Sequence, residues 1–372
     1  MKRWAVLLMG VGLVFSAGAV PAPPTGQSLM ASFSGLGFLS TVGFGSWAWD
    51  VSANGLAVTG GSFYSDWGQA FIWTAERGIT PLPLMPGKDP NSDGDGLSAD
   101  GSKVAGTCGW EFSGYEASVW SYDGAQWNVE GLGDLAGGSF DSHAYYMNPA
   151  ATVIVGEANS DKGTEASRWM LEGDVWIIKG LGDLPKGAYW SQAYGASKDG
   201  SVVVGQGSIA NGTRAFRWTS KGMADLGTVA KRKYSAAWGC SEDGSVVVGE
   251  SFSARGKDEI AFRWTAATGM VGLGDLPGGQ VLSEAEATNA DGSIVVGWST
   301  TDLGMEAFIW DNANKMRRLT DVLSAQGVTD HNGWVLSSAT GVTAVGDTLV
   351  IVGKGKNPDG NTEAWRAVIA NY

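Results

Sequence analysis

Charged residues, histidine and cysteine are all scarce in this sequence. Only 17% of its 372 residues are charged, and it holds two histidines and two cysteines. No amphipathic window of helical length follows the first segment, which argues against a helical protein. His143 and His331 form no Ser-His-Asp or Cys-His arrangement with other residues, so nucleophilic catalysis of that kind is not expected.

Positive charge is also in short supply. The chain has 25 Lys and Arg residues against 38 Asp and Glu residues, a formal net charge of −13. An acidic surface repels phosphate backbones, so we expect no nucleic-acid partner. No cluster of Lys and Arg indicates a membrane surface.

The amino terminus has the pattern of an export signal. Lys2 and Arg3 precede an apolar run from Trp4 to Phe15, and a small-x-small site follows at Ala17 to Ala19. The run is shorter than the roughly 20 residues of a membrane anchor. We expect a secreted, extracellular or periplasmic protein, not inserted in a membrane after cleavage. The expected segments are a signal peptide (1–19), a linker (20–30) and one domain (31–372).

Glycine and tryptophan are abundant, with 57 and 18 copies, and they mark a repeat. The clearest copy spans 235–279 and holds four short β segments: SAAWGCS, SVVVGES, IAFRWTA and GMVGLGDL. Asp243-Gly244 predicts a two-residue hairpin turn between the first two segments. The second segment ends in an anchor glycine, found at Gly60, Gly106, Gly156, Gly205, Gly249, Gly297 and Gly353.

Seven copies of a four-strand unit predict an all-β fold, a seven-bladed β-propeller of four-stranded antiparallel blades. A β-helix is the alternative, but its coils are shorter and more evenly spaced. Two copies lack the usual turn residues, with Ala150-Ala151 in the third and Asp347-Thr348 in the seventh, and we expect looser or different turns there. The third segments end in Trp at 73, 120, 169, 218, 264 and 310, and we expect the Phe/Trp face to fill the space between blades.

The last copy ends without a fourth strand. The segment 32–39, SFSGLGFL, resembles the fourth-strand segments of other copies, so the amino-terminal strand is expected to complete the last blade and close the ring. Cys108 and Cys240 belong to copies that lie nearly opposite each other in such a ring. We therefore expect two free, buried thiols and no disulfide.

The combination S-x-A-x-x-x-S-x-D-G-S-x-V-V-G, then AFRW, then LGDLPGG, resembles the HAF-type extracellular repeat of bacterial secreted proteins, over nearly all of 32–372. The His of that repeat's His-Ala-Phe is replaced here by Gln69, Arg214, Ile260 and Glu306. The resemblance implies a secreted repeat protein and supplies no catalytic residues.

First strands line the central channel of most propellers, so the residues on either side of the small residue in S-x-A are candidate ligand contacts. Aromatic rings stack on sugars and on cations, and the position holds several. The alternative is that these side chains pack between blades or line a water-filled channel. The candidates are Trp47, Trp49, Asp93, Asp95, His143, Tyr145, Tyr194, Trp238, Glu284 and Glu286.

Two further sites rest on carboxylates. Asp93, Asp95, Glu284 and Glu286 offer acid and base groups for glycoside cleavage. The segment that holds Asp89, Asn91, Asp93, Asp95 and Asp100 is expected to be an acidic solvated loop, and the alternative is a calcium loop with these residues as alternating oxygen ligands.

The main functional expectation is a secreted, monomeric, non-enzymatic module that binds a glycan or a protein and needs no cofactor. The alternatives are a secreted carbohydrate-active hydrolase or lyase that uses channel-mouth carboxylates, and a purely architectural surface protein.

Overall fold

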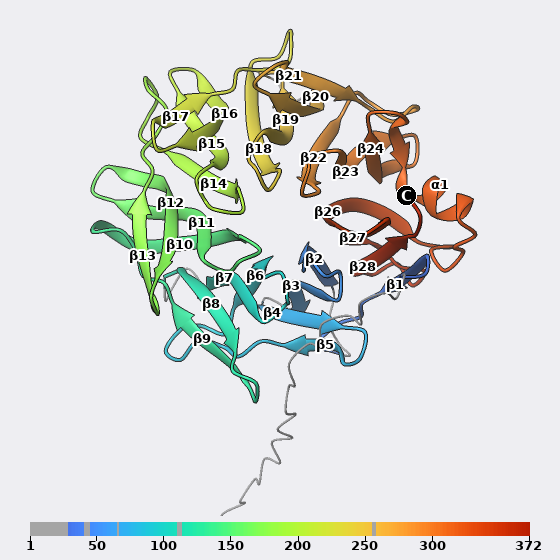
Figure 1. The fold of residues 1–372 in the computed structure, drawn as a ribbon, viewed down its shortest axis with the longest axis horizontal. Coiled ribbons are helices and arrows are strands. Elements are labelled where there is room, and N and C mark those ends of the chain that lie inside the picture. Colours follow the sequence, from blue (N-terminus) through green and yellow to red (C-terminus); the bar gives the residue numbers. More distant parts are fainter. Residues whose placement is uncertain (1–28, 41–44, 65–66, 110–113, 255–257) are drawn as a thin grey trace, which may run out of the picture.

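The computed structural model describes residues 29–40, 45–64, 67–109, 114–254 and 258–372. Its strands form meandering sheets arranged as a ring, with the first strand of each sheet nearest the centre (Figure 1). The predicted signal peptide and most of the predicted linker lie outside the described residues. Within those residues no helix is long and apolar enough to cross a membrane.

Six four-stranded sheets of the described chain follow one another in sequence, each in the order of its strands, and one parallel bridge between Gly45 and Thr362 joins the first of them to the seventh. The first has β2 (Gly45–Val51), β3 (Ala57–Tyr64), β4 (Trp67–Thr74) and β5 (Gly78–Pro81). The second has β6 (Ser92–Leu97), β7 (Lys103–Cys108), β8 (Glu116–Tyr122) and β9 (Trp127–Gly131). The third has β10 (Gly137–Met147), β11 (Val153–Ser160), β12 (Gly163–Glu172) and β13 (Val175–Gly180).

The fourth sheet has β14 (Ser191–Ala196), β15 (Val203–Ile209), β16 (Gly212–Thr219) and β17 (Gly222–Asp225). The fifth has β18 (Tyr234–Cys240), β19 (Val246–Phe252), β20 (Glu259–Thr265) and β21 (Gly269–Gly274). The sixth has β22 (Ser283–Thr288), β23 (Ile294–Thr301), β24 (Gly304–Asp311) and β25 (Lys315–Arg318).

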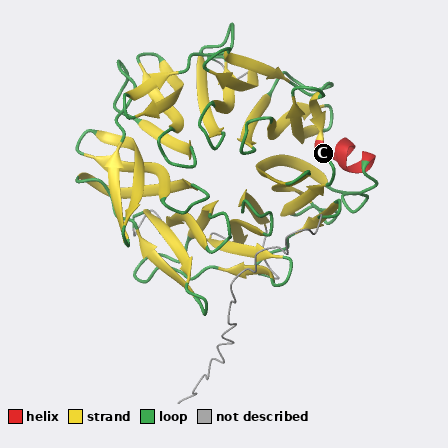
Figure 2. Ribbon diagram, in the orientation of Figure 1, coloured by secondary structure: helices red, strands yellow, loops and turns green. Residues whose placement is uncertain are grey.

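The seventh sheet uses both ends of the chain. Its strands are β26 (Val335–Val345), β27 (Thr348–Lys356) and β28 (Thr362–Ile369), and β1 (Ser32–Gly35) adds to β28 in antiparallel pairing. The closing strand is therefore the amino-terminal one, as predicted. A short helix, α1 (Leu319–Ala325), stands on the outside of the ring between the sixth and seventh sheets (Figure 2).

A β-bulge recurs in the first strand of all seven sheets. In each, the pairing skips the residue that follows the small residue of S-x-A, for example Trp238 between Ala237 and Gly239. A bulge re-aims a side chain and bends its strand. Here it directs the variable residue of every copy toward the channel.

The close approach of the first strand explains why each anchor position is a glycine. Each pairs with the small residue of the first strand, as Gly249 does with Ala237. A Cβ at any of the seven would lie 1.9–2.0 Å from a carbonyl oxygen of the first strand, such as that of Ala236 for Gly249. Only glycine permits this approach.

The serine of S-x-A joins neighbouring sheets. Ser235 Oγ accepts the Ala215 N–H of the preceding sheet at 3.0 Å and donates to the Gly227 carbonyl at 2.7 Å. The same amide-to-serine bond is made by five other pairs: Ala70 and Ser92, Ala117 and Ser142, Ala166 and Ser191, Ala261 and Ser283, and Ala364 and Ser46. The Ser of one copy and the Ala of the copy before it therefore form a recurring hydrogen bond that joins neighbouring sheets.

The hairpin turns differ from the prediction. The Asp-Gly turn is not a two-residue turn, because Ser241 N–H bonds to the Val246 carbonyl and four residues lie between them. The side chain of Asp243 closes this longer loop by accepting from Ser241 Oγ and from the Ser245 N–H. Gly244 takes the left-handed conformation, at φ 65°.

The third turn is not looser, contrary to the expectation for Ala150-Ala151. Ala151 takes the glycine's left-handed place, at φ 52°, and its N–H bonds to the Asn148 carbonyl at 2.8 Å. Asn148 Oδ1 accepts the N–H of Val153, where four other copies use a serine and the sixth uses Asn289 in the same way. The seventh turn does differ, with Gly346 and Asp347 between the paired Val345 and Thr348.

The core lies between sheets. One cluster brings together Val246, Val248 and Leu276 of the fifth sheet's repeat with Phe308 and Trp310 of the sixth. Burial of such a side chain stabilises the fold by about 1.5–3 kcal/mol. Both cysteines are free as expected, but only Cys108 is fully buried, whereas Cys240 is half-buried.

Candidate active site in the propeller channel

A cavity of about 590 Å³ occupies the channel. Its lining includes residues that lie just after the ends of first strands, such as Ala53, Pro149 and Ala290. Trp298 and Lys354, from the second strands of the sixth and seventh sheets, line it as well. The bulges described above therefore place the variable residues of the repeat in one space.

The sequence candidates divide into two groups. Seven of them line the cavity: Trp49, Asp95, Tyr145, Tyr194, Trp238, Glu284 and Glu286. The other three contact members of this group. Trp47 lies against Trp49, Asp93 accepts the Trp49 indole N–H at 3.0 Å, and His143 stacks on Tyr145.

One wall of the cavity is aromatic. The ring centroids of Tyr145 and Tyr194 are 5.3 Å apart, and those of Tyr194 and Trp238 are 4.6 Å apart. Rings from three successive sheets thus form a continuous surface, called here the aromatic arc (Tyr145, Tyr194 and Trp238). Such a surface offers flat faces for stacking.

A hydrogen-bonded group supports this arc, called here the Glu157 network. The Tyr145 hydroxyl donates to Glu157 at 2.6 Å, and the Gln192 amide donates to the other carboxylate oxygen at 2.7 Å. The Tyr194 hydroxyl donates to the Gln192 side-chain oxygen, and the Gln206 amide donates to that same oxygen and to the Tyr194 hydroxyl. Burial and the Glu157 charge raise the pKa of Tyr145.

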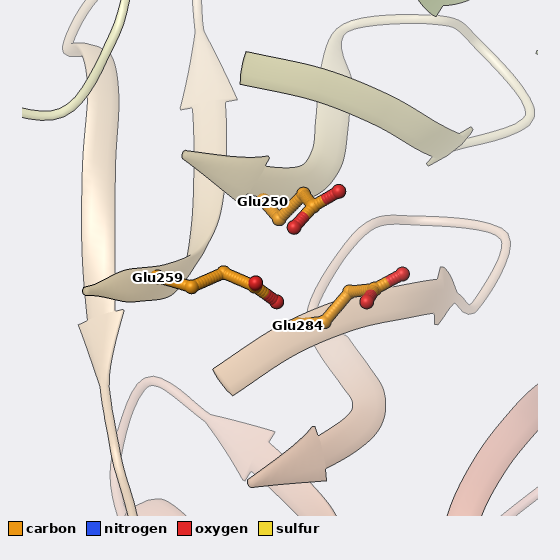
Figure 3. A group of neighbouring side chains, drawn as sticks. All are labelled: Glu250, Glu259 and Glu284. Atoms are coloured by element: carbon orange, nitrogen blue, oxygen red, sulfur yellow. The ribbon is translucent and has the colours of Figure 1, made fainter. Parts of the chain in front are cut away.

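Carboxyl groups gather where the fifth and sixth sheets meet, and one of them, Glu284, lines the cavity. Glu250 on β19, Glu259 on β20 and Glu284 on β22 point into a common space (Figure 3), with oxygens within 4.8 Å of one another. We call these three residues the acidic cluster. Burial, then repulsion by Glu284 and Glu259, raises the pKa of Glu250 to about 10. Burial, then repulsion by Glu286 and Glu259, raises the pKa of Glu284 well above its usual range.

Glu286, at the bulge of β22, lines the cavity together with Glu284. Ser338 Oγ donates to it at 2.7 Å. Burial raises its pKa, and the Ser338 hydrogen bond and the Lys354 charge oppose that rise. Lys354 Nζ stands 5.2 Å from the ring centroid of Trp47 and 4.9 Å from that of Trp49.

Asp93 and Asp95 form a second pair of buried acids. Burial raises the pKa of Asp93 to about 6, although the Trp49 N–H and Lys354 favour its anion. Burial and the Asp93 charge raise the pKa of Asp95 well above its usual range. The channel therefore holds several carboxyl groups that keep their protons at higher pH than free carboxyls do.

Sequence reasoning missed the residues that follow the anchor glycines. Glu157, Gln206, Glu250, Trp298 and Lys354 all occupy this position and lie across from the first strand, as Glu250 does from Ala236. A signal was present, because this position changes from copy to copy directly after a constant glycine. Glu259 lies outside that position, at the start of a third strand.

The expectation of an acidic solvated loop in this segment is wrong, and the calcium-loop alternative does not fit either. Asp93 and Asp95 lie in the extended strand β6, so the segment does not wrap around an ion. Asp100 instead closes the hairpin turn by accepting from Ser98 and Ser102. Within the described residues the acidic cluster, not this loop, brings three carboxyl groups within 4.8 Å. The acidic cluster offers only carboxylate oxygens, which are the ligands that hard divalent cations bind.

No protein-family model matches the chain, and no curated protein matches it. Solved structures do. An oligogalacturonate lyase from Vibrio parahaemolyticus superposes with a TM-score of 0.54 at 11% identity, over 92% of this chain and 96% of that one. An oligogalacturonate lyase in complex with manganese gives 0.53 at 13% identity, over 92% and 98%. The β-propeller domain of the Trilobed protease from Pyrococcus furiosus gives 0.53 at 10% identity, over 87% and 95%.

These similarities establish the β-propeller fold and correct the main functional expectation. We expected a non-enzymatic binding module because the sequence showed a bare propeller without a catalytic motif. Two neighbours that match over nearly their whole length are lyases, so a bare propeller is no argument against catalysis. The finding favours the enzymatic alternative.

Proposed function

We propose that the protein is a carbohydrate-active enzyme that cleaves a glycosidic bond in the channel, with Glu284 as the acid. The observation that carries this proposal is one cavity lined both by the aromatic arc and by carboxyl groups, of which Glu284 also belongs to the acidic cluster. Aromatic faces suit sugar rings, and glycoside cleavage requires a carboxyl group that remains protonated beside one that ionises.

The roles of the two acids follow from their surroundings. Glu284 faces Glu286 and Glu259, which disfavour its anion. Glu286 is assigned the role of the base, because Ser338 and Lys354 favour its anion, although burial raises its pKa as well. In hydrolysis, Glu284 gives its proton to the glycosidic oxygen as that bond breaks, water adds to the anomeric carbon, and Glu286 takes the proton that the water loses.

The proposed setting is outside the cytoplasm. The amino-terminal pattern of Lys2, Arg3 and an apolar run supports export, and the resemblance to HAF-type repeats supports secretion. The likeness in fold to oligogalacturonate lyases supports a saccharide as substrate. The reaction written above uses protein groups alone.

The test is release of reducing ends from a panel of neutral and uronic oligosaccharides, with and without a chelator. The Glu284→Gln variant should lose about 10²–10⁴-fold in kcat/KM while remaining folded, because it has no proton of suitable acidity to give. Glu172→Gln, an exposed change at the end of β12, is the matched control and should keep full activity. Equal activity of the Glu284→Gln variant and the wild type would remove Glu284 from the reaction.

A further inference from the structure

The indole N–H groups of three tryptophans in the cavity differ in their partners. Trp49 donates to Asp93 at 3.0 Å, and Trp298 donates to Glu284 at 3.1 Å. Trp238 Nε1 is buried and has no hydrogen-bond partner among the residues that the structure describes. A buried donor without an acceptor loses the hydrogen bond that it made to water. An acceptor atom of a ligand would restore that bond.

The position of Trp238 says what kind of ligand fits. Its ring continues the aromatic arc beside Tyr194, at 4.6 Å between centroids, and both rings line the cavity. A sugar ring has an apolar face for such a surface and carries acceptor oxygens at its edge. Stacking and one directed hydrogen bond can therefore act on the same ring.

The charges of the lining decide between neutral and acidic sugars. Among the described residues that line the cavity, Lys354 is the one basic side chain, against five acidic ones: Asp50, Asp95, Glu242, Glu284 and Glu286. Lys354 is already engaged with two indole faces and attracts Glu284 and Glu286. The burial that disfavours the anions of Glu284 and Asp95 would disfavour a uronate carboxylate beside them as well, whereas a neutral sugar carries no charge into the cavity.

We propose that Trp238 and Tyr194 form a subsite for a neutral sugar ring, in which the Trp238 indole N–H donates to a sugar oxygen, and that the channel disfavours uronates. This inference rests on the proposed action on saccharides and goes further by naming the substrate class. It separates this chain from its lyase neighbours, whose name states oligogalacturonate.

Calorimetric titration of the otherwise intact Glu284→Gln protein tests the inference without turnover. The probes are malto-, cello-, xylo- and chito-oligosaccharides and oligogalacturonate. At least one neutral series should bind at least tenfold more tightly than oligogalacturonate. Adding Trp238→Phe, which keeps a ring and removes the donor, should weaken that binding about tenfold, and Trp238→Ala should weaken it more. Trp127→Phe, on the outermost strand β9, is the matched control and should bind as before.

Three results would overturn the inference: oligogalacturonate binding as tightly as the best neutral series, no binding of any neutral series, or unchanged affinity in folded Trp238→Phe protein. Thermal melting of each variant checks folding. Failure of the proposed reaction looks different. If neutral sugars bind through Trp238 and the wild type cleaves none, the proposed reaction is rejected and the subsite is kept. If the wild type cleaves only oligogalacturonate, glycosidic cleavage is kept and the neutral-sugar subsite is rejected.

Discussion

Glu157 and Glu250 occupy the same place in the third and fifth sheets, directly after the anchor glycine, yet their surroundings are opposite. Glu157 accepts hydrogen bonds from Tyr145 and Gln192. Glu250 faces two other carboxyl groups, and burial with their repulsion raises its pKa to about 10. The comparison shows that the position itself is not functional. Its neighbours decide whether a carboxyl group stabilises the ring or is prepared for chemistry.

The difference traces to one residue in the next sheet. Gln192 and Glu284 hold equivalent places in the first strands of the fourth and sixth sheets, each opposite the residue after its own anchor glycine. An amide donates to a carboxylate, whereas a second carboxyl group can do so only when protonated. The Glu157 network thus satisfies its hydrogen bonds with amide and hydroxyl donors, whereas the carboxyl groups of the acidic cluster retain protons.

The largest expected effect is on the pH dependence of stability. Glu250 keeps its proton up to about pH 10 in the folded protein, whereas the usual value for a free glutamate is near 4.5. The folded state therefore binds more protons than the unfolded chain between these values, and stability falls as pH rises, by about 1.4 kcal/mol per pH unit for each such proton. Asp50, with a pKa raised by burial to about 7, acts in the same direction between about 3.8 and 7.

Thermal melting from pH 5 to 9 measures this effect. The melting temperature of the wild type should fall across the range, and that of Glu250→Gln should fall less. Glu172→Gln serves again as the control, with the slope of the wild type. A wild-type melting temperature that rises from pH 5 to 9 would show that the acidic cluster is ionised in the folded protein at neutral pH.

A reciprocal exchange of the two equivalent residues comes next in size. Gln192→Glu should destabilise the protein by about 1–3 kcal/mol at pH 7, because it removes a donor to Glu157 and adds a like charge. Glu284→Gln should have the opposite sign, because it relieves repulsion and supplies a donor to Glu250. Chemical unfolding at pH 7 compares the two. If both exchanges destabilise the protein equally, the Glu157 network and the acidic cluster do not differ as described.

The frame of this molecule could be predicted from sequence, because seven copies repeat the same requirements. The serine, the small residue and the anchor glycine recur since each serves contacts that every pair of neighbouring sheets must make. Closure by 32–39 followed from the missing last strand and is observed as the pairing of Ser32 with Val368. The channel position of Trp49 or Trp238 followed from the same alignment.

The chemistry of the channel could not be predicted in the same way. The acidic cluster depends on Glu250 and Glu284 coming from neighbouring sheets, and on Glu259 reaching them from a third strand. Alignment of repeats shows none of these cross-sheet contacts. The expectation of an acidic loop, and with it the calcium alternative, failed because Asp93 and Asp95 belong to an extended strand, which the spacing of acidic residues alone did not reveal.

The central claim is that the acidic cluster of the fifth and sixth sheets holds a protonated carboxyl group at neutral pH. Infrared difference spectroscopy at pH 7 detects it directly, since a protonated carboxyl group absorbs apart from a carboxylate. The account predicts a protonated carboxyl band in the wild type, reduced in the Glu284→Gln variant and unchanged in Glu172→Gln. The same spectrum for the wild type and Glu284→Gln would contradict it.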